Sequence, residues 1–587
     1  MNMHWSLEKL YSSFESEKFK DDIKKLTNIL AKLKKWEATN NKDNIKLAEE
    51  FIESLQKYYN IYTKLKAYSR LTISVDASNE QGLKIVEKLE NMVTELTKPR
   101  VKFQLWLQDL PNRETMYNNS EILAEHRFFM EELVEKAEYL LPTGEETIIA
   151  KMKQTGSSAW SKLQEKSTST LMVPIKMEGT EKELPLPVVQ NMAYRQDAKL
   201  RKKGYKAELA AYNKIEEGIA AALNGIKGEV LTLTGKRGYK SPLEKTLFDS
   251  RMDHKTLSAL LDSIKERLPI FHKFYRKKAK LLGHSDGLPF YDLFAPLGEK
   301  EMKFSYKEAQ NFIIENIRPF SKQMADFYTT AFAENWIDAK PRNGKRGGAF
   351  CYNIPPINES RILSNFTGVF SDVTTLAHEL GHAYHGYCLQ NESILNTDYP
   401  MPLAETASIF SETVVIEAAL KKADPDQSIT ILENKISHDL AVIVDIYSRF
   451  LFEKRLFAER KEASLNVDEL KEMMVAAQKK AYANSLNHKL LHPYMWLNKP
   501  HYYSADYNYY NFPYTFGLLF GLGVYSLRKE KGAKFMDEYN NLLKSTGKNK
   551  IVDVAKMIGI DVHSCKFWKD SLQIVENNIK KFFELTK

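Results

Sequence analysis

Two histidines four residues apart, with a glutamate beside the first, are the residues of this chain best suited to chemistry. His378, Glu379 and His382 form an H-E-x-x-H pattern. Positions i and i+4 of an α-helix share one face, so both imidazoles can converge on one metal ion. Neutral imidazole suits Zn²⁺, and the neighbouring carboxylate can take a proton from a water molecule that the metal activates. The motif predicts a catalytic zinc site with Glu379 as general base.

A catalytic zinc ion needs a third protein ligand, because such sites use three protein ligands and one open position. Glu405 is the best candidate. It lies 23 residues beyond His382 (405 − 382), in the first turn of a predicted helix that begins with Pro402. Two antiparallel helices joined by the loop 391–400 can bring this carboxylate to the ion. We therefore expect His₂Glu coordination of one Zn²⁺ per chain.

Two further residues near the motif have open roles. Glu412 shares the helix face of Glu405 and could hold a ligating histidine through its second ring nitrogen, or be a plain surface acid. His385 lies about 7.5 Å along the helix axis from the midpoint of the histidine pair, which favours a supporting or surface position over ligation. A metzincin would have glycine at 385 and histidine at 388. The chain has His385 and Cys388, which excludes that class.

A tyrosine-rich segment, residues 501–514, could supply groups that stabilise a reaction intermediate. Peptide hydrolysis develops negative charge on the former carbonyl oxygen, and a phenol or an imidazole can donate a hydrogen bond to it. Aromatic packing is the alternative explanation and should hold for most of these tyrosines. The preferred functional pair is His501 and Tyr510, with Tyr507 and Tyr514 as lesser candidates.

These motifs resemble the oligoendopeptidase F branch of the thimet-oligopeptidase-like metallopeptidases. The likeness extends from about residue 110 to the end of the sequence, and its most specific parts are H-E-L-G-H (378–382), A-E-T-A-S (404–408), H-Y-Y (501–503) and Y-Y-N-F-P-Y-T-F-G (509–517).

The resemblance implies a mostly helical protein with a deep channel that has zinc at its floor and admits only short unstructured peptides. It implies His378, His382 and Glu405 as ligands and Glu379 as base. It also implies that His501 and Tyr510 stabilise the transition state. The segment 504–509 departs from the family's pattern, so Tyr507 and Tyr514 stay open as alternatives to Tyr510.

Helix-period segments must position these residues, and the predicted class is mainly α, two-lobed, with a small β element beside the motif helix. Ser371 or Asp372 is the expected N-cap of that helix, and Gly381 should let another segment approach closely. Residues 361–367 predict a strand that either pairs with an extended peptide or serves structure alone. Residues 168–188 predict a hairpin or linker. We expect an N-terminal helical lobe at 1–190 and a catalytic lobe at 191–587.

Composition favours a soluble protein without nucleic-acid or membrane partners. The net charge of +9 on 587 residues is small, and the basic residues are scattered over predicted helix faces. The three cysteines form no disulfide framework, which fits a reducing compartment. The N-terminus lacks the layout of a signal peptide, and no run of about twenty apolar residues occurs. These features predict a cytoplasmic protein, and they leave its oligomeric state open.

Together the residues predict a zinc endopeptidase that acts on oligopeptides. A metallocarboxypeptidase of similar helical build, using the same ligands, is one alternative. A non-catalytic peptide-binding protein with a structural metal is another, although structural zinc sites are typically closed by four protein ligands.

Overall fold

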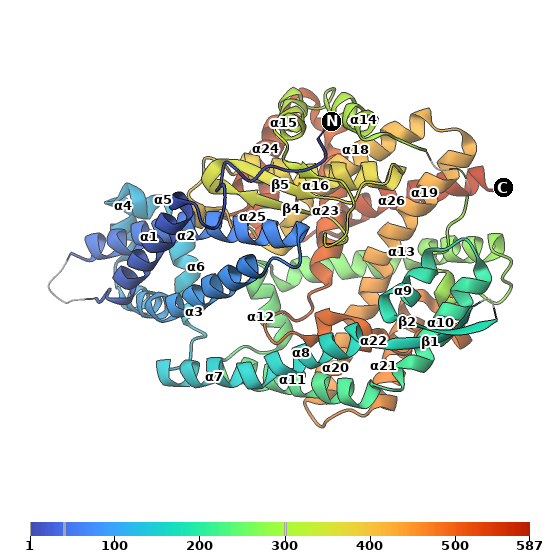
Figure 1. Cartoon of the computed structure of the whole chain (residues 1–587), viewed down its shortest axis with the longest axis horizontal. Coiled ribbons are helices and arrows are strands. Elements are labelled where there is room, and N and C mark those ends of the chain that lie inside the picture. Colours follow the sequence, from blue (N-terminus) through green and yellow to red (C-terminus); the bar gives the residue numbers. More distant parts are fainter. Residues whose placement is uncertain (1, 39–42, 178, 299, 301) are drawn as a thin grey trace. The chain divides into compact units, whose positions relative to one another are not determined.

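Helices dominate the computed structural model, which describes residues 2–38, 43–177, 179–298, 300 and 302–587 (Figure 1). Within this part of the chain, strands form only two small sheets, so the predicted mainly α class is confirmed. Two compact units alternate along the sequence: Met1–Tyr139, Met302–Lys421 and Val524–Ile560 form the first, and Leu140–Glu301, Lys422–Gly523 and Asp561–Lys587 form the second. Position 190 falls inside the second unit, and the division into lobes at this position stays a prediction, as does the channel.

The first unit combines an N-terminal group of helices with a three-stranded sheet and the motif helix. One apolar cluster joins residues of the N-terminal helices, such as Phe51 and Leu65, to Ile354 of the sheet. The helices of the first unit are α1 (Glu17–Lys34), α2 (Asn44–Val75), α3 (Glu80–Asp109), α4 (Arg113–Asn118), α5 (Glu121–Glu125), α6 (Arg127–Ala137), α14 (Tyr306–Ile317), α15 (Lys322–Ala333), α16 (Phe370–Cys388), α17 (Met401–Ala404), α18 (Thr406–Lys422), α24 (Phe535–Ser545) and α25 (Ile551–Lys556).

The sheet of the first unit has the strand order β3-β5-β4 and packs against α16. Its strands are β3 (Ile337–Asp338), β4 (Phe350–Ile354) and β5 (Glu359–Leu363). The β element predicted beside the motif helix is therefore confirmed, but residues 364–367 lie outside the strand that was expected to include them. Because β5 is the central strand, both of its edges pair with neighbours, which favours a structural role over pairing with a peptide.

The second unit is a helical assembly with one hairpin. The hairpin consists of β1 (Met172–Met177) and β2 (Thr180–Pro185), which confirms the hairpin alternative for residues 168–188. The helices are α7 (Thr143–Thr155), α8 (Ser157–Ser169), α9 (Leu186–Gln190), α10 (Ala198–Tyr212), α11 (Glu216–Lys236), α12 (Pro242–Asp249), α13 (His254–Leu281), α19 (Pro425–Leu440), α20 (Ile446–Arg460), α21 (Val467–Tyr482), α22 (Met495–Asn498) and α26 (Cys565–Leu585). Helix α23 (Phe512–Lys531) continues from the second unit into the first.

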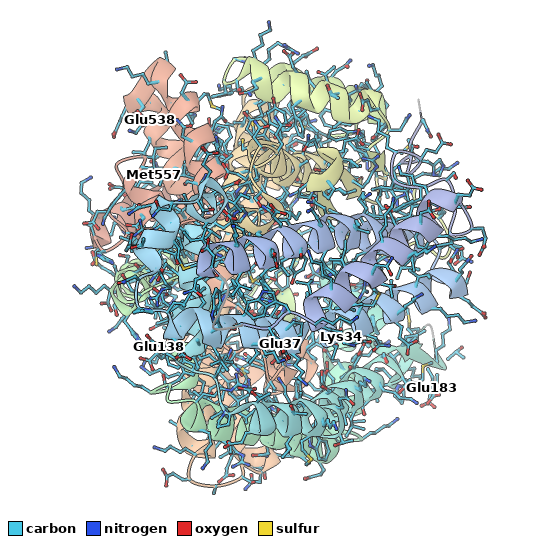
Figure 2. All side chains as sticks on the ribbon, turned by 90° about the vertical axis from the view of Figure 1, so that its left-hand side faces the viewer. Lys34, Glu37, Glu138, Glu183, Glu538 and Met557 are labelled. Carbon is cyan, nitrogen blue, oxygen red and sulfur yellow. The ribbon has the colours of Figure 1, made fainter. Side chains whose placement is uncertain are left out.

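Charged side chains lie exposed at the surface, as Figure 2 shows for Lys34 at the end of α1, for Glu37 just after that helix and for Glu138 just after α6. This fits the expectation that scattered charge covers solvated helix faces. None of the described helices is both long and apolar enough to cross a membrane. A cytoplasmic location stays a prediction.

Candidate metal centre

The H-E-x-x-H motif lies in the middle of α16, as predicted. The expected N-cap was wrong, because the helix begins at Phe370 with Val369 as N-cap, two or three residues earlier than expected. Asp372 contributes differently, from within the first turn. Its Oδ2 accepts hydrogen bonds from the backbone N–H groups of Thr367 (2.6 Å), Gly368 (2.9 Å) and Val369 (3.3 Å). A carboxylate at this position satisfies backbone donors just before the helix and favours its positive end.

Gly381, between the two histidines, allows α16 and α18 to meet backbone to backbone. A Cβ atom at this position would lie 2.4 Å from the carbonyl oxygen of Ala407 and 2.6 Å from the Cα of Ser408. The predicted close approach is confirmed. Because Glu405 lies just before α18, this contact between helices brings its carboxylate to the two imidazoles.

Two imidazoles and one carboxylate converge on a single point. Glu405 Oε2 lies 3.2 Å from His378 Nε2 and 3.6 Å from His382 Nε2. Ligand atoms of the three residues all lie within 4.8 Å of one another. Tetrahedral zinc with ligands at about 2.1 Å separates its ligand atoms by about 3.4 Å. The donor types and their spacing therefore fit a zinc ion, and the structure brings the three predicted ligands together.

Hydrogen bonds with neighbouring residues hold each of the three predicted ligands in place. Glu412 Oε2 lies 3.1 Å from His378 Nδ1, so its carboxylate can fix the ring with Nε2 facing Glu405. This geometry favours the first of the two roles considered for Glu412, that of holding His378 through its second ring nitrogen, over that of a plain surface acid. Ser408 Oγ donates to Glu405 Oε2 at 2.7 Å, and Asn353 Nδ2 donates to the backbone carbonyl of His382 at 3.2 Å. Sequence analysis missed Ser408 and Asn353, although the spacing of three residues between Glu405 and Ser408 is a usable signal.

The pKa values of the acids and imidazoles reflect burial and mutual contact. Burial acts to raise the pKa of Glu405, but the hydrogen bond with His378 and the charge of His382 lower it to about 2. Burial lowers the pKa of His382 to about 4. Burial raises the pKa of Glu379 to about 7, although the charge of His378 acts in the opposite direction. Glu405 thus stays ionised, as an anionic ligand would need to, and Glu379 has the proton affinity that general bases need near neutral pH.

His385 is neither a ligand nor a surface residue. Its side chain is fully buried, its Nε2 lies 2.8 Å from Thr546 Oγ1, and its ring stacks on Tyr399 with centroids 4.1 Å apart. Burial lowers the pKa of this imidazole to about 3, so it stays neutral. His385 supports the packing of the motif helix.

The predicted aromatic residues form one cluster in the second unit. The Tyr510 ring stacks on the ring of His501, which lies in a 3-10 turn (η8, Pro500–Tyr503), with centroids 5.4 Å apart. Tyr507 and Tyr514 contact Tyr510 with centroid distances of 5.6 and 5.9 Å. Burial, and then the charges of Arg449 and Lys499, lower the pKa of His501 to about 4. A neutral imidazole and the phenols can donate hydrogen bonds, but their part in the reaction stays a prediction.

A buried ion pair holds the loop that carries these rings. Lys227 Nζ donates to Glu453 Oε1 and to Asn508 Oδ1, both at 2.8 Å, and Glu453 Oε2 accepts from the backbone N–H of Tyr509 at 3.1 Å. Tyr509 has a positive φ of 49°, which an unanchored tyrosine rarely adopts. Sequence analysis gave no signal for this pair, because its members come from two helices more than 200 residues apart.

Gly381→Ala is expected to weaken zinc binding by more than about tenfold and to destabilise the fold by about 2 kcal/mol, since the new methyl group must push α18 away. Zinc titration against a chromophoric chelator and thermal unfolding measure both effects. The matched control is Gly218→Ala in α11, where a Cβ meets nothing within 4 Å. The control should bind zinc normally, and its free energy of unfolding should rise by up to about 1 kcal/mol. Normal zinc binding by Gly381→Ala would show that the close approach of the helices does not set the site.

Comparison with known proteins assigns this constellation to a family. The model of peptidase family M3 matches residues 191–574, which include all three predicted ligands and the aromatic cluster. The chain belongs to peptidase family M3. The Oligopeptidase F model of the same branch matches residues 113–172. The resemblance stated from the motifs is thereby confirmed, and membership of M3 supports a metallopeptidase function.

Relatives in this branch cover nearly the whole chain. An oligoendopeptidase F homolog of Lactococcus lactis is 24% identical over 96% of this chain and 97% of its own length. One from Borreliella burgdorferi is 26% identical over 91% of both chains. Among solved structures, oligoendopeptidase F from Enterococcus faecium has a TM-score of 0.73 at 18% identity and covers 97% of this chain and 99% of its own. This likeness shows the helical M3 fold.

Proposed function

We propose that this chain is a zinc-dependent endopeptidase that hydrolyses short unstructured oligopeptides, with one zinc ion per chain. The convergence of His378, His382 and Glu405, with Glu379 adjacent to the first, carries the proposal. Structural zinc sites typically have four protein ligands. Within the described chain the group of potential ligands has three members, which favours a site with a position open to substrate. The names of the relatives, oligoendopeptidase F, support oligopeptides as the substrate class.

The roles of the residues follow from their chemistry. When bound, zinc polarises the scissile carbonyl and lowers the pKa of a water molecule. Glu379 takes the proton of the attacking water and passes it to the leaving amine. His501 and Tyr510 donate hydrogen bonds to the carbonyl oxygen as it gains negative charge, with Tyr507 and Tyr514 as alternative donors.

Digestion of a mixed peptide library with and without a chelator tests the proposal. We expect internal cleavage of short peptides that stops with the chelator and returns with zinc. Peptides blocked at both ends separate the two peptidase types, because a carboxypeptidase would leave them intact. Binding of peptides without cleavage under any metal condition would instead favour a non-catalytic binding protein.

A further inference from the structure

A cavity of about 540 Å³ lies within the second unit, and we call it the Lys499 cavity after its most unusual residue. Segments far apart in sequence line it, from α10, α13, α20, α21 and the stretch 492–499. Aromatic side chains form much of its wall: Tyr194, Tyr205, Phe290, Tyr291 and Phe294. The volume is that of a small-ligand pocket, and the mixture of rings and polar groups suits a peptide side chain.

The carboxylates that line the Lys499 cavity are already paired. Asp445 Oδ2 lies 2.5 Å from Arg449 Nη2. Glu208 Oε1 accepts from the hydroxyl of Tyr212 at 2.7 Å and lies 3.6 Å from His492 Nε2. Burial acts to raise the pKa of Glu208, but these contacts lower it to about 2. Glu208 therefore remains ionised, and both acids are held by neighbouring groups.

Lys499 is the exception among these charges. Its ammonium group has no hydrogen-bond or ion-pair partner within the described residues, although the side chain is partly buried. Burial, and then the charge of Arg449, lower the pKa of Lys499, which shows that its charge is poorly compensated. The cavity thus has one unmatched positive charge, and an anionic group is what would complete it.

The helix beside the cavity is locally widened. Residues Ala441–Asp445 form a π-helical turn (η5) between α19 and α20, and Ala441, Val442 and Asp445 line the cavity. The hydroxyl of Thr515 donates to the carbonyl of Val442 at 2.6 Å. Such turns cost regular hydrogen bonds and occur frequently at functional sites. This turn places Asp445 against the wall, where it holds Arg449.

We propose that the Lys499 cavity binds a carboxylate of the peptide substrate, from an acidic side chain or from the C-terminus. The inference rests on the proposed peptidase function, because it assumes that His501 contacts the substrate. Lys499 lies two residues before His501, and its charge is felt at that imidazole. A peptide held by His501 would therefore have a neighbouring group within reach of the cavity. Lys499 then acts as a specificity-determining residue.

The test uses full-length, zinc-loaded enzyme and two series of internally quenched peptides. In the first series the C-terminus is amidated and glutamate replaces glutamine at each position in turn. In the second series a free C-terminal acid is compared with the amide. kcat/KM is measured for the wild type, Lys499→Met, Lys499→Glu and the matched control Lys454→Met, whose exposed lysine on α20 does not line the cavity.

We expect the wild type to favour the carboxylate by about tenfold in one series, which identifies its source. Lys499→Met should lose this preference, Lys499→Glu should reverse it, and Lys454→Met should keep it. Cleavage by the wild type without any preference, or a preference that survives Lys499→Met, would overturn the inference while leaving the peptidase function intact.

An equilibrium measurement separates failure of the inference from failure of the proposed function. Fluorescence anisotropy of labelled peptides with the Glu379→Gln variant reports binding without turnover. Tighter binding of the carboxylate peptide that disappears when Lys499→Met is added supports the cavity assignment, even if the wild type cleaves none of the peptides. Equal binding of acid and amide peptides contradicts the assignment.

Discussion

Glu379→Gln is expected to lower kcat by about 10²- to 10⁴-fold while leaving zinc content at the wild-type level. The amide has the size of the carboxylate but cannot accept the proton of the attacking water. Glu379 is 7% exposed, and burial raises its pKa to about 7, so the wild-type side chain suits proton transfer near neutral pH. Steady-state hydrolysis of a blocked peptide and metal analysis of the same preparation measure both quantities.

The control for this substitution is Glu87→Gln, on an exposed position of α3 in the same unit. It should change neither activity nor metal content. The folded state should tolerate Glu379→Gln, because a neutral amide avoids the cost of burying a carboxylate. Hydrolysis by Glu379→Gln at more than about one tenth of the wild-type rate, with zinc in place, would remove Glu379 from its role as base.

The convergence of the three proposed ligands could be predicted, because the spacing and number of zinc ligands follow from simple rules. An α-helix requires that residues four apart share a face, which fixed His378 and His382 as a pair. Catalytic zinc requires a third ligand, which directed attention to Glu405. Gly381 was recognisable because a glycine inside a helical pattern weakens the helix unless close packing requires it.

The supporting contacts could not be predicted, because they depend on the path of the chain in three dimensions. Asn353 reaches the carbonyl of His382 only because β4 packs against α16. Asp372 could be recognised as a residue near the helix start, but which amides it accepts depends on the turn before Phe370. Strand β5 was expected to continue to residue 367, but residues 364–367 leave the sheet and lead into α16.

The unpaired charge of Lys499 could not be predicted from the sequence either. In the sequence Lys499 is one of 85 basic residues and has no motif around it. Its lack of a partner becomes visible only when Asp445 and Glu208, from distant segments, are seen to be held by other groups. Whether a charged side chain has a partner depends on all the segments that form the cavity, whereas the spacing of His378 and His382 depends on one helix.

Glu405→Ala is expected to lower zinc affinity by at least about 100-fold, more than the loss of a supporting contact would cause. The substitution removes the only carboxylate of the proposed ligand set and leaves two imidazoles in an edge-to-face arrangement with ring centroids 4.9 Å apart. Without this carboxylate, the ligand set has no negative charge to compensate the charge of the cation in this half-buried site. Metal analysis after dialysis against a mild chelator, together with competitive zinc titration, measures the effect.

Glu379→Gln is the informative comparison for Glu405→Ala, because each removes one carboxylate beside the two histidines, one from α16 and one from the residue just before α18. Both substitutions should abolish most of the activity, but only Glu405→Ala should lose the metal. Excess zinc should restore part of the activity of Glu405→Ala and none of the activity of Glu379→Gln. This dissociation distinguishes a ligand from a base. Retention of stoichiometric zinc by Glu405→Ala would mean that another residue completes the coordination, and the assignment of His378, His382 and Glu405 as the ligand set would fail.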